Sequence, residues 1–191
     1  MTTTDNTVAR PRRYVLLLLV ALTAIVADFL TKEWVLAAFS PGERLDVVGD
    51  LVQFTLVYNT GAAFSLGTGY TWVFTAIASV VVLAIAWIGW RVRSLWWGAT
   101  LGLMMGGAAG NLVDRYFRGE TPGTGAVVDF ISVGTFPVFN LADSCVVVGA
   151  CLVVALTFKG LNLDGTRAVG ETAEPDEPSA KDGDNDKGSG A

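Results

Sequence analysis

The feature that most constrains this chain is a series of apolar runs long enough to cross a membrane. Residues 70–90 and 95–113 contain no charged side chain, and residues 14–36 and 139–158 are apolar apart from isolated charges. A helix needs about 20 residues to span the hydrocarbon core of a bilayer. Charged residues make up only 16% of the chain, against roughly 25% in soluble domains. The sequence therefore predicts an all-α integral membrane protein with four transmembrane helices at about these ranges.

The distribution of Lys and Arg predicts the orientation of these spans. If both termini are cytoplasmic, nine basic side chains lie inside and four outside, in agreement with the positive-inside rule. The predicted organisation is a cytoplasmic N-terminus (1–13), a four-span membrane domain (14–159), extracytoplasmic segments at about 40–69 and 114–137, and a cytoplasmic tail (160–191).

The two ends of the chain carry further signals. The first apolar run has small residues at Ala37 and Ala38 and could end in a signal-peptide cleavage site. This alternative is disfavoured because Asp28 and Lys32 interrupt the run before that site. Residues 160–191 hold eight acidic and three basic side chains and are rich in Gly, Ser and Pro, a composition that predicts a disordered tail. The remainder of the chain has no net charge, which argues against binding to nucleic acid.

The composition also excludes several kinds of catalytic site. The chain has no histidine, so a Ser-His-Asp triad, a Cys-His pair and an HExxH zinc site are impossible. Its two cysteines, Cys145 and Cys151, lie six apart in one apolar run. They are too few for a tetrahedral zinc site or a disulfide framework. We therefore expect no metal site.

The predicted extracytoplasmic segments differ in character. Residues 51–58 alternate and are rich in β-formers, which predicts one or two strands that end in a turn. Residues 114–137 contain several glycines and are interpreted as a flexible loop that leads into a short apolar segment, 127–133. In the third apolar run, glycines recur at every fourth position from 98 to 110, a pattern typical of close helix packing.

The unusual polar residues are all predicted to lie at one depth, the outer boundary of the membrane. They are Asp28, Lys32, Asn59, Asn111, Asp114, Arg115, Asp129, Asn140 and Asp143. Ionisable groups at such a depth are costly and are functional candidates. Asp28 and Lys32 are spaced for an i, i+4 ion pair, which favours a structural role. Asp114 and Arg115 are interpreted either as a helix-end charge pair or as functional groups.

Asp129 and Asp143 differ from these because each is surrounded in the sequence by apolar or small residues, without an adjacent cation. Two carboxylates brought close together cannot both ionise readily, so one keeps its proton near neutral pH. The ionised group can then activate water while the protonated group binds the carbonyl oxygen of an amide. The pair is predicted to be a catalytic dyad for amide hydrolysis.

Five sequence blocks, in this order and spacing, resemble the bacterial lipoprotein signal peptidases, also called signal peptidase II. They are DFLTK (28–32), NTGAAFS (59–65), GGAAGNLVDR (106–115), VVDF (127–130) and FNLADS (139–144). The resemblance covers roughly residues 14 to 158. It implies an aspartic endopeptidase of the bacterial inner membrane that cleaves prolipoproteins before a diacylglyceryl-modified cysteine. It also implies inhibition by the cyclic peptide globomycin, no cofactor, contact with membrane lipid, and a monomer.

The resemblance assigns roles to individual positions. Asp129 and Asp143 match the catalytic dyad. The positions that match substrate-binding or dyad-orienting residues are Asn59, Gly61, Asn111, Arg115 and Asn140, and those that match supporting residues are Asp28, Lys32 and Asp114. The chain departs from the family in its acidic tail and in a longer glycine-rich loop, 119–125.

Other functions remain alternatives at this point. A small proton-coupled transporter or channel would also contain intramembrane carboxylates, but it should carry polar groups on both sides of the midplane. A GxGD-type intramembrane protease is disfavoured because Gly123-Thr124-Gly125 is followed by Ala126. A membrane scaffold that packs through the glycine stripe leaves Asp129 and Asp143 unexplained.

Overall fold

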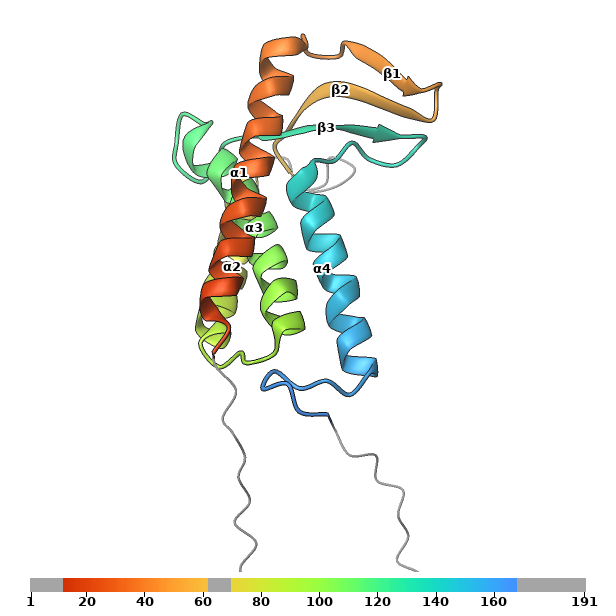
Figure 1. Cartoon of the computed structure of the whole chain (residues 1–191). Coiled ribbons are helices and arrows are strands. Elements are labelled where there is room, and N and C mark those ends of the chain that lie inside the picture. Colours follow the sequence, from red (N-terminus) through yellow and green to blue (C-terminus); the bar gives the residue numbers. More distant parts are fainter. Residues whose placement is uncertain (1–11, 62–69, 168–191) are drawn as a thin grey trace, which may run out of the picture.

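The computed structural model describes residues 12–61 and 70–167, which form a helical bundle capped at one end by a small sheet (Figure 1). The elements are α1 (Tyr14–Ala38), β1 (Arg44–Val48), β2 (Val52–Asn59), α2 (Thr71–Gly89), α3 (Leu95–Phe117), β3 (Val127–Val133) and α4 (Leu141–Phe158). We call the end that carries the sheet the sheet end, and the end near residues 160–167 the tail end.

The third helix is the centre of the bundle, and its glycines explain why. A Cβ atom on Gly106 would lie 2.7 Å from the Ala21 carbonyl oxygen of α1, so only glycine permits this approach. Gly107 lies equally close to the start of α4, against the backbone of Ala142. The predicted packing role of the glycine stripe is confirmed for these contacts. At the tail end, Leu17, Val92 and Leu101 contribute to an apolar core shared by the helices.

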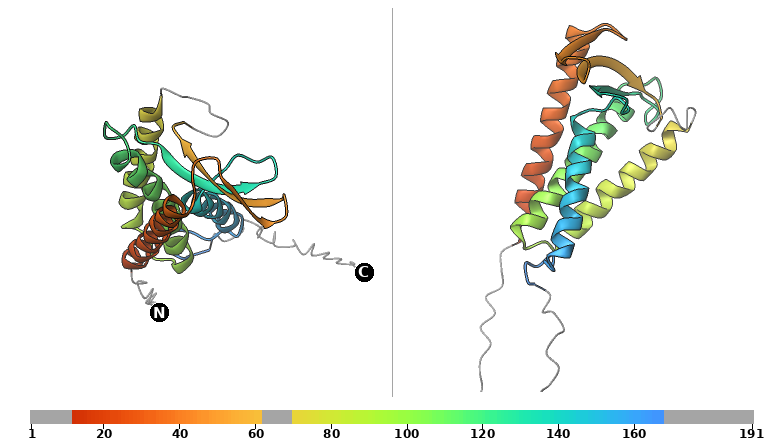
Figure 2. Two further views of the ribbon diagram at one scale, coloured as in Figure 1. Left: turned by 90° about the horizontal axis from the view of Figure 1, so that it is seen from above. Right: turned by 90° about the vertical axis from the view of Figure 1, so that its right-hand side faces the viewer.

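Helices α1, α2 and α4 are long and apolar enough to cross a membrane. α3 has 23 residues and runs beside them, but its glycines and polar side chains leave it less apolar than the other three. The multi-pass membrane architecture is thus supported, while the fourth span and the orientation stay predictions. Toward the sheet end, α2 diverges from α4 (Figure 2, right).

The sheet has the order β1-β2-β3, with both pairs antiparallel. β2 agrees with the predicted strand. The loop predicted from residue 114 begins later, because α3 continues to Phe117. The apolar segment 127–133, whose secondary structure the sequence left open, is the strand β3, paired with β2 at Val57 and Asp129. Backbone pairing with β2 satisfies polar groups that an apolar loop would leave unpaired.

The tail also begins later than predicted. The backbone amides of Arg93 and Ser94 donate to the Leu163 carbonyl oxygen at 2.9 and 3.1 Å, and Trp97 Nε1 donates to the Leu161 carbonyl oxygen at 2.7 Å. Leu161 and Leu163 pack against the apolar core at the tail end. Residues 160–167 therefore belong to the folded domain, and the rest of the predicted tail, 168–191, lies outside the described residues.

Candidate active site

Asp129 is positioned by the pairing of β3 with β2 at the sheet end of the bundle. Its side chain is 2% exposed. One carboxylate oxygen accepts a hydrogen bond from Asn140 Nδ2 at 2.6 Å, and the other from Asn59 Nδ2 at 2.9 Å. Burial raises the pKa of Asp129 to about 7, and the negative charge of Asp143 acts in the same direction, against the hydrogen bond from Asn59. The two predicted dyad residues therefore interact electrostatically.

Asp143 is positioned by the first turn of α4, which has a capping box. The Asn140 side-chain oxygen accepts from the Asp143 backbone amide at 2.9 Å, and Asp143 Oδ2 accepts from the Asn140 amide at 3.2 Å. Asn111 Nδ2 donates to Asp143 Oδ1 at 2.7 Å. These N–H donors fix the orientation of the Asp143 carboxyl group at the start of α4.

Asn140 joins the two carboxylates. It is fully buried, and its Nδ2 atom donates to Asp129 and also to Asn111 Oδ1, at 3.0 Å. Because Asn111 in turn donates to Asp143, the dyad is held by a chain of neutral amides. This chain fixes the amide orientations of Asn111 and Asn140, since each has its oxygen and its nitrogen committed to a different partner.

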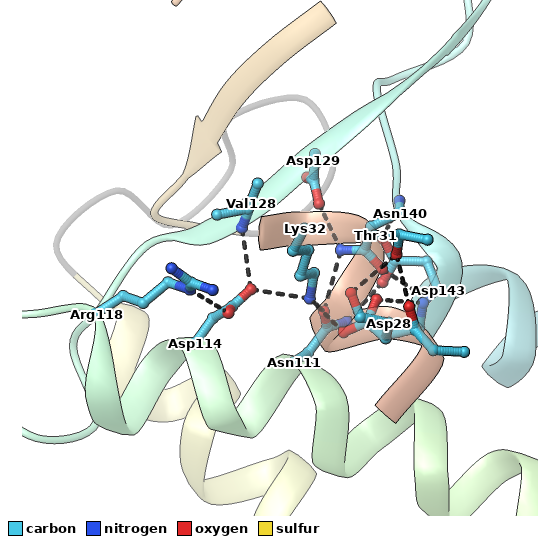
Figure 3. Close-up of polar contacts among 12 residues, drawn as sticks. Asp28, Thr31, Lys32, Asn111, Asp114, Arg118, Val128, Asp129, Asn140 and Asp143 are labelled. Carbon is cyan, nitrogen blue, oxygen red and sulfur yellow. Dashed lines mark hydrogen bonds and ion pairs between the residues drawn. The ribbon is translucent and has the colours of Figure 1, made fainter. Parts of the chain in front are cut away.

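The predicted supporting residues form a separate buried cluster around Lys32 (Figure 3). Lys32 Nζ lies 2.7 Å from Asp28 Oδ2, 2.8 Å from Asp114 Oδ2 and 3.1 Å from Asn111 Oδ1. Asp28, Lys32 and Asp114 are each 1% exposed. We call these three residues the lysine cluster. The predicted Asp28–Lys32 ion pair is present.

The lysine cluster also holds the backbones that carry the dyad. Asp28 Oδ1 accepts from the backbone amide of Ala142, beside Asp143, at 2.9 Å. Asp114 Oδ2 accepts from the backbone amide of Val128, beside Asp129, at 3.1 Å. Each carboxylate of the cluster therefore anchors the neighbour of one dyad residue.

The sequence left two interpretations of Asp114 and Arg115 open, and the described residues show no ion pair between these two side chains. Among the described residues, Asp114 pairs with Lys32 and with Arg118 Nε, the latter at 2.6 Å. Adjacent residues on a helix point in different directions, so Arg115 reaches another partner. Its Nη2 donates to the Gly61 carbonyl oxygen at 3.1 Å, while Nη1 is buried with no hydrogen-bond partner among the described residues.

The dyad lies in a cavity of about 880 Å³. Of the predicted site residues, those that line it are Asp129, Asp143, Asn59, Gly61, Asn111 and Arg115. Asn140 and the lysine cluster lie behind this lining. The wall also includes apolar side chains that the sequence did not single out, namely Phe74, Phe136, Phe139, Val147 and Val148. Within the described ranges, no group of three or more His, Cys, Asp or Glu side chains could hold a metal ion.

The chain is similar to known proteins in both sequence and fold. The family model described as Signal peptidase (SPase) II matches residues 20–159. The lipoprotein signal peptidase of Mycolicibacterium smegmatis is 52% identical over 170 residues, covering 87% of this chain and 72% of the relative. The lipoprotein signal peptidase of Mycobacterium tuberculosis (strain H37Rv) is 51% identical over 159 residues, covering 83% and 79%.

Two solved structures described as a bacterial membrane enzyme share the fold. The first, obtained by the in meso method at 2.3 Å resolution, has a TM-score of 0.68 and 28% identity, over 75% of this chain and 87% of its own. The second, at 1.9 Å resolution, has a TM-score of 0.66 and 28% identity, over 75% and 92%.

Proposed function

The chain belongs to the signal peptidase II family, and we propose that it is an aspartic endopeptidase that removes signal peptides from prolipoproteins. Its substrates are cleaved before a diacylglyceryl-modified cysteine. The observation that carries the aspartic mechanism is the amide-linked pair of Asp129 and Asp143 in one cavity. We also propose that the protein acts as a monomer.

The proposed reaction uses one proton shared by the dyad. With a pKa of about 7, Asp129 is the carboxyl that holds a proton near neutral pH. Asp143 is then the base: it takes a proton from water, and the resulting hydroxide attacks the scissile carbonyl carbon. Asp129 donates its proton to the carbonyl oxygen, giving a neutral gem-diol.

The second half of the reaction restores the dyad. Asp143 returns its proton to the amide nitrogen, and the C–N bond breaks. Asp129 recovers a proton from one gem-diol hydroxyl as the new carboxyl group forms. The products are the signal peptide and a lipoprotein with the modified cysteine at its N-terminus. Arg115 Nη1 is buried and unpaired among the described residues, so it is placed to donate a hydrogen bond to a substrate backbone oxygen.

The cavity has the chemistry that this substrate requires. Polar groups gather at the dyad, and the rest of the lining is apolar, including Val147 and Val148 on the face of α4. Phe74 of α2 and both of these valines line the same cavity, so the peptide would reach the carboxylates between α2 and α4 while the acyl chains stay in lipid. A proton-coupled transporter is less well supported, because the described tail-end half of the bundle is an apolar core.

We further propose that α3 also crosses the membrane, that both termini are cytoplasmic, and that the sheet end faces outward from the bacterial inner membrane. Reporter fusions test this directly. Fusions at Gly67 and Gly123 should report the extracytoplasmic side, and fusions at Ser94 and Gly165 the cytoplasm. A cytoplasmic signal at Gly123 would place the dyad in the wrong compartment and overturn this part of the proposal.

The activity is tested by incubating the purified protein with a diacylglyceryl-modified prolipoprotein and with the same protein lacking the lipid. Only the modified substrate should shorten, and mass spectrometry should find the modified cysteine at the new N-terminus. Globomycin should block the reaction, and EDTA should not. Cleavage at another bond would refute the substrate assignment. Loss of activity in EDTA that a divalent metal restores would refute the aspartic mechanism.

A further inference from the structure

The first turns of α2 contain buried polar side chains in an otherwise apolar helix. Thr71 and Thr75 are 7% and 4% exposed. With Phe74 they follow an i, i+3, i+4 spacing, so the three side chains share one face of the helix. Hydroxyl groups on a membrane helix need partners, and both of these find one outside α2.

Thr75 holds the glycine-rich loop 119–125. Its Oγ1 atom donates to the Gly123 carbonyl oxygen at 2.6 Å. That loop lies against the end of α3, where the amides of Gly123 and Gly125 both donate to the Arg115 carbonyl oxygen at 2.9 Å. A Cβ atom on Gly125 would lie 2.5 Å from the Asp114 carbonyl oxygen, and Gly123 has a φ of 90°. Because these positions are glycines, the loop can pack closely against the backbone of Arg115.

Thr71 contacts the chain segment that accepts a hydrogen bond from the Arg115 side chain. Its Oγ1 atom donates to the Thr60 carbonyl oxygen. The next carbonyl oxygen, that of Gly61, accepts from Arg115 Nη2 at 3.1 Å. Phe74 lies between the two threonines in sequence, and its ring centroid is 5.9 Å from the Arg115 guanidinium carbon. The start of α2 thus contacts the guanidinium group of Arg115 directly through Phe74. It contacts the surroundings of Arg115 through Gly123, which donates to the Arg115 carbonyl oxygen, and through Thr60, which precedes the acceptor Gly61.

We propose that Thr71 and Thr75 are positioning residues that orient the Arg115 side chain toward the cavity. The 119–125 loop connects Thr75 to the backbone of Arg115. The proposal rests on the proposed function, since it concerns how Arg115 Nη1 meets a substrate backbone oxygen. It gives a role to the loop by which this chain departs from its family. It also explains why a helix beside the cavity carries two buried hydroxyls.

Thr75→Val tests this inference because valine keeps the size and branching of threonine but removes the donor. The Arg115 side chain should then be less well oriented toward the substrate backbone oxygen, which it binds both before and during the reaction. KM for the modified substrate should therefore rise about tenfold, while kcat changes less than about twofold. Thr71→Val should act in the same direction. Thr75→Ser restores the hydroxyl and should return KM to near the wild-type value.

Thr157→Val is the matched control. Thr157 Oγ1 donates to the carbonyl oxygen four residues earlier in α4, at 2.8 Å, at an exposed position of the tail end. This variant loses a hydroxyl of the same kind on a membrane helix but should leave KM and kcat unchanged. If it raises KM as much as Thr75→Val does, the effect is general to helix threonines and the inference is wrong.

A double-mutant cycle separates positioning from a purely structural role. In an Arg115→Lys background the guanidinium that Thr75 positions is already gone, so adding Thr75→Val should change KM by less than about twofold. If Thr75→Val still raises KM about tenfold in that background, the inference is wrong. It is also wrong if KM of the Thr75→Ser variant is as high as that of Thr75→Val. If the wild-type protein does not cleave the substrate, the proposed function fails. If it cleaves and neither threonine variant alters KM, only this inference fails.

Discussion

Two pairs of carboxylates lie close together at the sheet end, and they have very different hydrogen-bond and ion-pair partners. Asp28 and Asp114 share the ammonium group of Lys32 at 2.7 and 2.8 Å. Asp129 and Asp143 form no ion pair among the described residues, and accept their hydrogen bonds from neutral amides. A carboxylate that shares a buried cation is committed to an ion pair and holds structure. A carboxylate held by amides can exchange a proton, which is what a hydrolase needs.

The two groups are also mechanically connected. Lys32 donates to Asn111, which donates to Asp143. Asp28 and Asp114 bind the backbone amides beside Asp143 and Asp129. The lysine cluster is therefore the rigid support on which the reactive pair is held, and the comparison predicts opposite consequences for substitutions in the two groups.

The largest expected effect is on activity, in the dyad. Asp129→Asn and Asp143→Asn should each reduce kcat about 10⁴-fold or more, because one residue is needed as base and the other as acid. The double variant should be little worse than either single variant. Single-turnover cleavage of the modified substrate measures this. A variant that keeps more than about a tenth of wild-type activity, a barrier increase of only ~1.4 kcal/mol, would show that its residue is not catalytic.

Substitution in the lysine cluster should instead destabilise the fold. Lys32→Met leaves the buried Asp28 without a cation and Asp114 with Arg118 alone, and breaking a buried ion pair costs about 3–5 kcal/mol. Asp28→Asn should cost less, because Lys32 keeps Asp114 as a partner. Thermal unfolding in detergent should rank wild type above Asp28→Asn, and Asp28→Asn above Lys32→Met. A Lys32→Met protein that is as stable as wild type but inactive would mean that the cluster acts in the chemistry.

Whether each of these interactions could be predicted from the sequence depends on how far apart its partners lie along the chain. The Asp28–Lys32 pair is local, with an i, i+4 spacing, and the sequence predicted it. The second partner of Lys32 is Asp114, on another helix, and no local pattern identifies such a contact. Asp129 and Asp143 could be singled out because neither has a cation nearby in the sequence, but their amide link through Asn140 depends on how β3 meets α4.

The missed features have physical causes as well. A short apolar run such as Val127–Val133 is compatible with a buried strand, a loop or part of a helix, and only its pairing with β2 decides among these. Phe74, Val147 and Val148 line the cavity, yet in the sequence they are indistinguishable from side chains that face lipid. Thr71 and Thr75 carried no signal because a threonine in a membrane helix can satisfy its hydroxyl within its own helix.

The dyad should show the opposite stability effect from the lysine cluster, and this effect should depend on pH. The pKa of Asp129 is raised from 3.8 to about 7 by burial, so ionisation of this group favours the unfolded state. Its stability contribution is present below about pH 4 and is lost as the pH rises through 7. Asp129→Asn removes the ionisable group and should raise the unfolding temperature at pH 8, by an amount equivalent to at most about 4 kcal/mol.

This gain should shrink as the pH falls and should vanish below about pH 3, where Asp129 is neutral in both states. Thermal unfolding of wild type and variant across this range measures it, with Thr157→Val as a control whose difference from wild type should not vary with pH. An Asp129→Asn protein that is less stable than wild type at pH 8 would place Asp129 with the structural carboxylates and remove the distinction between the two groups.

The smallest effect is expected at the exposed edge of the lysine cluster. Arg118 bonds Asp114 on one side and Glu33 on the other, with Glu33 47% exposed and Arg118 23% exposed. Exposed ion pairs contribute only about 0–1 kcal/mol and weaken with salt. Glu33→Gln should therefore shift the unfolding temperature slightly at low ionic strength and not at all at high salt, and it should leave kcat and KM unchanged. A loss of stability as large as that of Lys32→Met would mean that the support for the dyad extends through Arg118 to the surface, because only a strained or cooperative network would transmit so much from an exposed pair.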